Sequence, residues 1–123
     1  MPRISAALAL AAAAALAPPA AASDFVPVRD KDRFVALVEG RELRLGLFRI
    51  SLSVTRDGRI EGSALGWGVT GTWAWKDGYF CRELDWSGTA IPYNCQLVEA
   101  RGDSELRFTV DRGAGDSASF RLN

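Results

Sequence analysis

The residue pair best suited to acid–base chemistry is Glu83 and Asp85, two carboxylates one residue apart. If this segment is a strand, their spacing places both side chains on one face. Two carboxyl groups that share a buried pocket acquire separated pKa values, so that one can serve as an acid and the other as a base. They are therefore weak catalytic candidates, and a solvated strand face is the simpler interpretation because a general base needs a cleft.

Aromatic side chains are concentrated in residues 71–95, which contain three of the four Trp and both Tyr. Such clusters line apolar pockets and stack on sugars or cations, although packing in a core is their commoner role. Of the four tryptophans, we expect Trp86, beside the Ser87-Gly88 turn, to be the most exposed. The candidate ligand-binding residues are Trp73, Trp75, Tyr79, Trp86 and Tyr93.

The two cysteines, Cys81 and Cys95, are expected to form a disulfide that staples neighbouring strands. If they do, Tyr79, Glu83, Asp85, Ile91, Tyr93 and Leu97 share their face. The sequence contains no His and no CxxC spacing, so it predicts neither a metal site nor a Ser-His or Cys-His pair. The glycine-rich residues 111–116 lack the lysine and the following helix of a phosphate loop, and we expect a hairpin loop there and no cofactor.

Residues 1–22 predict a signal peptide. Arg3 provides a positive start, an Ala/Leu run follows, and Ala20-x-Ala22 fits the cleavage rule for small residues. We therefore expect residues 23–123 to form a single disulfide-stapled β domain that is periplasmic or secreted.

The charge balance limits the partners. Lys and Arg total 15, as do Asp and Glu, whereas proteins that bind nucleic acids or anionic membranes concentrate positive charge. We expect no nucleic-acid partner and, once the leader is removed, no membrane association. The partner is then a small apolar or aromatic ligand, or another protein.

Local patterns predict one short helix followed by a meander of strands. Residues 31–39 carry apolar side chains at helical spacing, with Asp30 as a candidate N-cap and Gly40 suited to the C-terminal end. Beyond Arg41 the period changes to two, and Asp57-Gly58 and Asp77-Gly78 signal tight hairpins. We expect a mainly β fold, a small antiparallel up-and-down β-barrel or sandwich of about eight strands.

A resemblance to a known family rests on three segments of the chain. They are Gly71-Thr-Trp-Ala-Trp-Lys-Asp-Gly-Tyr-Phe-Cys-Arg-Glu-Leu, Pro92-Tyr-Asn-Cys-Gln and residues 106–122. They resemble a family of small exported alphaproteobacterial proteins that often carry the label dihydrodipicolinate reductase. That label implies an NAD(P)H-dependent enzyme with a dinucleotide-binding βαβ unit. The chain has no GxGxxG motif between a strand and a helix and no parallel-sheet pattern, so no residue of such a reductase can be placed on it.

Two functions are consistent with these patterns. The first is an exported, non-enzymatic binding domain with a cavity lined by Trp73, Trp75, Tyr79 and their neighbours. The alternative is an enzyme, either the reductase that the label names or a carboxylate-dependent hydrolase that uses Glu83 and Asp85.

Overall fold

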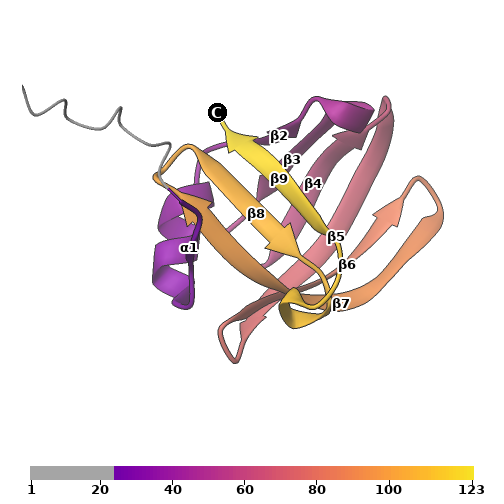
Figure 1. Ribbon diagram of the computed structural model, residues 1–123. Helices are drawn as coiled ribbons and strands as arrows, with labels where there is room; N and C mark the ends of the chain where they lie inside the picture. Colours follow the sequence, from indigo (N-terminus) through magenta and orange to yellow (C-terminus); the bar gives the residue numbers. More distant parts are fainter. Residues whose placement is uncertain (1–23) are drawn as a thin grey trace, which may run out of the picture.

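The protein is a closed antiparallel β-barrel with one helix at an end, as the computed structural model in Figure 1 shows for residues 24–123. The expected signal peptide lies outside the described residues. The helical elements are α1 (Lys31–Val38) and two 3-10 turns, η1 (Leu47–Arg49) and η2 (Asp111–Gly113). The strands are β1 (Val26–Pro27), β2 (Leu43–Leu45), β3 (Ile50–Val54), β4 (Arg59–Ala64), β5 (Trp67–Lys76), β6 (Tyr79–Trp86), β7 (Thr89–Arg101), β8 (Glu105–Thr109) and β9 (Ser117–Leu122).

The barrel has up-and-down topology. Each strand from β2 to β8 pairs with the next one along the chain, and pairing of β9 with β2 closes the cylinder. Strand β1 adds to the side of β7 as an extra, ninth strand. The mainly β fold and the eight-stranded barrel are therefore confirmed, and the closed sheet excludes the sandwich that the sequence left open.

Helix α1 covers one end of the barrel and fills it. Phe34 is fully buried, and its ring centroid lies 5.4 Å from that of Trp73, 5.0 Å from Trp75 and 5.1 Å from Phe80. The helix position was predicted correctly, and Gly40 adopts the left-handed φ of +70° expected beyond its C-terminus. Asp30 is the N-cap residue, as predicted, but its side chain makes no capping hydrogen bond.

The hairpin turns confirm the sequence signals. Asp77 and Gly78 both have positive φ, of 52° and 82°, and join β5 to β6. This is the backbone of the two-residue turn that Asp-Gly favours. Strands β6 and β7 are linked by the predicted disulfide, because Cys81 on β6 lies directly opposite Cys95 on β7.

A β-bulge interrupts the pairing of β6 with β7. Arg82 pairs with Asn94 and Leu84 pairs with Ile91, so that one residue of β6 faces two residues of β7. The extra residue changes the alternation of β7 and directs Ile91 into the barrel. The expectation that Ile91 shares the face of the disulfide was therefore wrong.

Candidate functional site

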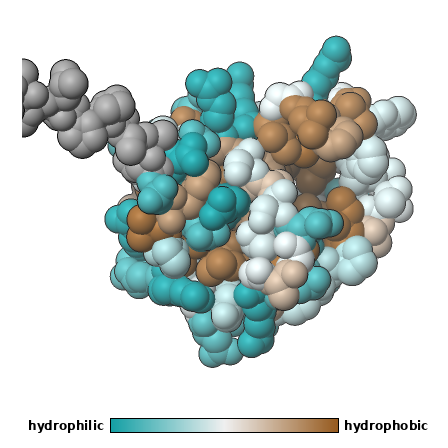
Figure 2. Space-filling model, in the orientation of Figure 1, coloured by the Kyte–Doolittle hydropathy of each residue, from teal (hydrophilic) through white to brown (hydrophobic). Residues whose placement is uncertain are grey.

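The barrel encloses an apolar cavity of about 550 Å³. The core around Phe34 occupies the end covered by α1, and the cavity extends from there toward the opposite end. That end carries η1, the β4–β5 turn and the β8–β9 loop. In Figure 2, apolar residues gather over the part of the surface formed by η1 and the β4–β5 turn, beside a hollow. The volume lies within the range of small-molecule sites.

The cavity wall has an apolar side and a polar side. Strands β2 to β5 contribute only apolar residues to the lining, for example Leu52, Ile60 and Val69. The polar members come from β6, β7, the end of the β8–β9 loop and the start of β9, and they are Arg82, Gln96, Asp116 and Ser117. A ligand in this cavity would therefore meet hydrocarbon on one side and a small set of polar groups on the other.

Arg82 is the one cation of the lining among the described residues. It lies on β6 with the same orientation as Phe80 and Leu84, and burial lowers the pKa of its guanidinium. Its Nη1 donates a 2.7 Å hydrogen bond to the carbonyl oxygen of Pro92, a residue within the bulge. Arg82 takes part in none of the ion pairs formed within residues 24–123.

Gln96 is the second polar group that faces the cavity from deep in the wall. Its side chain is buried and forms none of the side-chain hydrogen bonds found in residues 24–123. On β7 it lies two residues from Asn94, the partner of Arg82, so Arg82 and Gln96 are diagonal neighbours on the inner face. Long side chains at such positions can reach a common group.

The mouth of the cavity is formed partly by strained backbone that exposes apolar side chains. Phe48 and Leu65 have φ of 65° and 52° and are 55% and 49% exposed. The Leu65 N–H donates a 2.9 Å hydrogen bond to the Phe48 carbonyl, which ties the two segments together. Left-handed backbone in residues other than glycine or asparagine is unfavourable and is often found at functional sites.

The five candidate ligand-binding residues separate into three groups. Trp86 lines the cavity, and its Nε1 donates to the Ala64 carbonyl at 3.0 Å. Trp73 and Trp75 instead pack against Phe34 in the core under α1, and neither lines the cavity. The expectation that Trp86 would be the most exposed tryptophan was wrong, because Trp67 is 63% exposed and Trp86 is half-buried.

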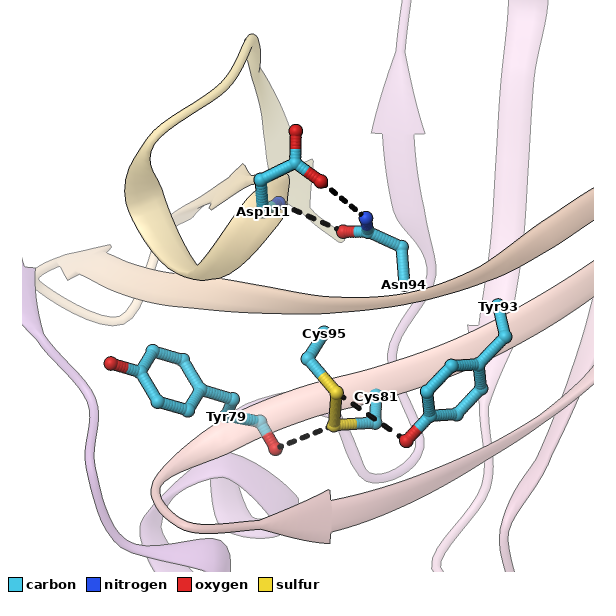
Figure 3. Close-up of a disulfide and its surroundings, with 6 residues drawn as sticks. All are labelled: Tyr79, Cys81, Tyr93, Asn94, Cys95 and Asp111. Atoms are coloured by element: carbon cyan, nitrogen blue, oxygen red, sulfur yellow. Dashed lines mark hydrogen bonds between the residues drawn. A yellow bond between two sulfur atoms is a disulfide. The ribbon is translucent and has the colours of Figure 1, made fainter.

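Tyr79 and Tyr93, the other two candidates, flank the disulfide on the outer face of the barrel (Figure 3). The Tyr93 hydroxyl lies 3.4 Å from Cys95 Sγ. The Tyr79 ring has the guanidinium groups of Arg29 and Arg112 at 5.4 and 5.2 Å from its centroid. Stacking with cations holds this surface together but does not place either tyrosine in the cavity.

The carboxylate pair also lies outside the barrel. Glu83 and Asp85 are both exposed on the outer face of β6, away from the cavity. Asp85 accepts a 3.0 Å hydrogen bond from the Gly88 N–H and thereby stabilises the β6–β7 turn. This arrangement gives the pair no shared pocket in which one carboxyl group could act as a base.

Sequence reasoning missed Arg82 and Gln96. The signal for Arg82 is its place in the alternation Phe80, Arg82, Leu84, in which a charged residue interrupts an otherwise apolar strand face. Gln96 gave a weaker signal: it alternates with the buried Val98 and Ala100, but Asn94, the preceding residue on that face, is also polar.

Residues 24–123 contain neither a group of His, Cys, Asp and Glu residues suited to hold a metal ion nor a helix long and apolar enough to cross a membrane. Comparison with protein-family models, with curated proteins and with solved structures found no match to this chain.

Proposed function

We propose that this protein is an exported binding domain that carries a small apolar ligand inside its barrel. The observation that supports the proposal most directly is the apolar cavity of about 550 Å³, which opens at the end opposite α1. A barrel of eight strands is wide enough to be filled by side chains or to hold one small ligand. Here only the helix-covered end is filled.

The disulfide supports an exported location. A bond between Cys81 and Cys95 favours an oxidising environment, because cytosolic thiols are kept reduced. The predicted leader narrows this environment to the periplasm or the outside of the cell. The resemblance to small exported alphaproteobacterial proteins supports the same location.

The test uses the mature, oxidised chain and N-phenylnaphthylamine, a neutral dye that fluoresces in apolar surroundings. We expect saturable binding to the wild-type protein. Ala118, which lines the cavity from β9, is replaced by tryptophan to fill the space. The Ala118→Trp variant should bind the dye about ten-fold more weakly or worse, because the large ring excludes the ligand.

The matched control is Ala90→Trp, which adds the same ring on the exposed outer side of the barrel. It should bind the dye like the wild-type protein, and both variants should keep the wild-type circular dichroism spectrum. Equal dye binding by the wild-type, Ala118→Trp and Ala90→Trp proteins would show that the dye binds elsewhere. That result would contradict the proposal.

A further inference from the structure

The polar side of the cavity indicates which ligands the barrel selects. Arg82 is a cavity-lining cation that uses one of its five N–H donors on the Pro92 carbonyl and forms no ion pair within residues 24–123. Several arginines of the outer surface are paired with carboxylates, for example Arg44 with Glu42 at 2.6 Å and Arg107 with Glu99 at 3.0 Å. Arg82 thus differs from them in both position and pairing.

A cation in apolar surroundings is unfavourable unless it is paired and hydrogen-bonded. The guanidinium group presents its donors as a planar fork that matches a carboxylate in bidentate geometry. The buried Gln96 amide, a diagonal neighbour on the same wall, can donate a further hydrogen bond to the same group. The opposite wall, from β2 to β5, is apolar throughout its lining.

We propose that the ligand is an amphiphile with a carboxylate head, that Arg82 and Gln96 bind the head, and that its hydrocarbon body lies against the apolar wall. This inference rests on the proposed function and adds the chemical class of the ligand. Asp116, the one carboxylate among the described lining residues, is exposed at the mouth and forms no ion pair with Arg82. It leaves the positive charge of Arg82 free for a ligand.

Titration calorimetry with octanoate and octanol tests this selectivity, because the two compounds share a chain and differ in the head group. The wild-type protein should bind octanoate about ten-fold more tightly than octanol, the ratio expected for a charge-assisted bidentate contact. Arg82→Gln should remove this preference, chiefly by weakening octanoate binding. Arg82→Lys should retain part of it, because an ammonium group keeps the charge but loses the fork.

Arg44→Gln is the matched control, since it removes the same charge from the exposed outer side of β2. It should leave the ratio of octanoate to octanol affinity as in the wild-type protein. Gln96→Leu provides a second variant in case Arg82→Gln fails to fold. It should lower the affinity for octanoate about three-fold, because one hydrogen bond to the carboxylate is lost.

The outcomes separate this inference from the proposed function. Equal affinity of the wild-type protein for octanoate and octanol would overturn the carboxylate head and leave the apolar cavity as a binding site. Loss of octanoate selectivity in Arg44→Gln as well would also overturn it, because long-range charge would then explain the preference. If neither compound nor the neutral dye binds, both proposals fail.

Discussion

Leu65 occupies a turn position that two other hairpins of the barrel give to polar residues. In the turns Leu65-Gly66, Asp77-Gly78 and Ser87-Gly88 both residues have positive φ, with the first residue at 52°, 52° and 48°. Asn and Asp adopt this conformation more readily than Leu does. Leu65 lines the cavity mouth, so its side chain stands where the proposed ligand would contact it, at the expense of turn stability.

At the residue scale, Leu65→Asn should therefore raise stability and reduce binding together. Relief of the strained backbone should increase the free energy of unfolding by about 1 kcal/mol. The apolar contact at the mouth is lost, so dye affinity should fall. Urea unfolding and dye titration measure the two effects. An Asn variant that is more stable and binds as well as the wild-type protein would contradict this role for Leu65.

At the element scale, α1 decides which part of the barrel is core and which is cavity. Its buried face includes Phe34, Val35, Leu37 and Val38, and Phe34 contacts aromatic residues from β5, β6 and β8. Without the helix, the two ends of the barrel would both be open. The helix therefore closes the end of the barrel that it covers.

Phe34→Ala should strongly destabilise the packing of α1 on the barrel. Removing a fully buried phenylalanine lowers the free energy of unfolding by about 3–5 kcal/mol, because contacts are lost and a void remains. Arg33→Ala, on the exposed side of the same helix, should change it by less than about 0.5 kcal/mol. Urea unfolding of the two variants measures both changes in free energy. Similar effects of the two substitutions would mean that α1 does not seal the barrel.

At the scale of the whole molecule, the disulfide stabilises the fold through the unfolded chain. The two cysteines are 14 residues apart, and Cys81 is buried against the outer side of the β6–β7 pair. Cross-linking a loop of about this length removes unfolded-state entropy equivalent to ~3 kcal/mol. For a domain of this size that is a large share of the total stability.

The double variant Cys81→Ser with Cys95→Ser should lose about 3 kcal/mol of unfolding free energy and keep the β-rich circular dichroism spectrum of the wild-type protein. Wild-type protein with its disulfide reduced serves as the comparison and should unfold at nearly the same urea concentration as the variant. Unchanged stability in both proteins would show that the unfolded chain is already constrained without the bond.

The sequence by itself determined the local parts of this protein. The Asp77-Gly78 turn, the helix of residues 31–38 and the alternation of the strands depend on backbone preferences and on spacing within a few residues. The pairing of Cys81 with Cys95 also followed, because both cysteines lie in neighbouring strands of a meander. These features are readable because neighbouring residues alone specify them.

Only the tertiary structure decided where the site lies. The β-bulge that turns Ile91 inward depends on the register between β6 and β7, and the pairing of β9 with β2 closes the cylinder. The docking of α1 buries Trp73 in a filled end and leaves Arg82 facing the open one. Register, closure and docking arise from contacts between residues far apart in the chain, so the sequence alone could not separate core from cavity.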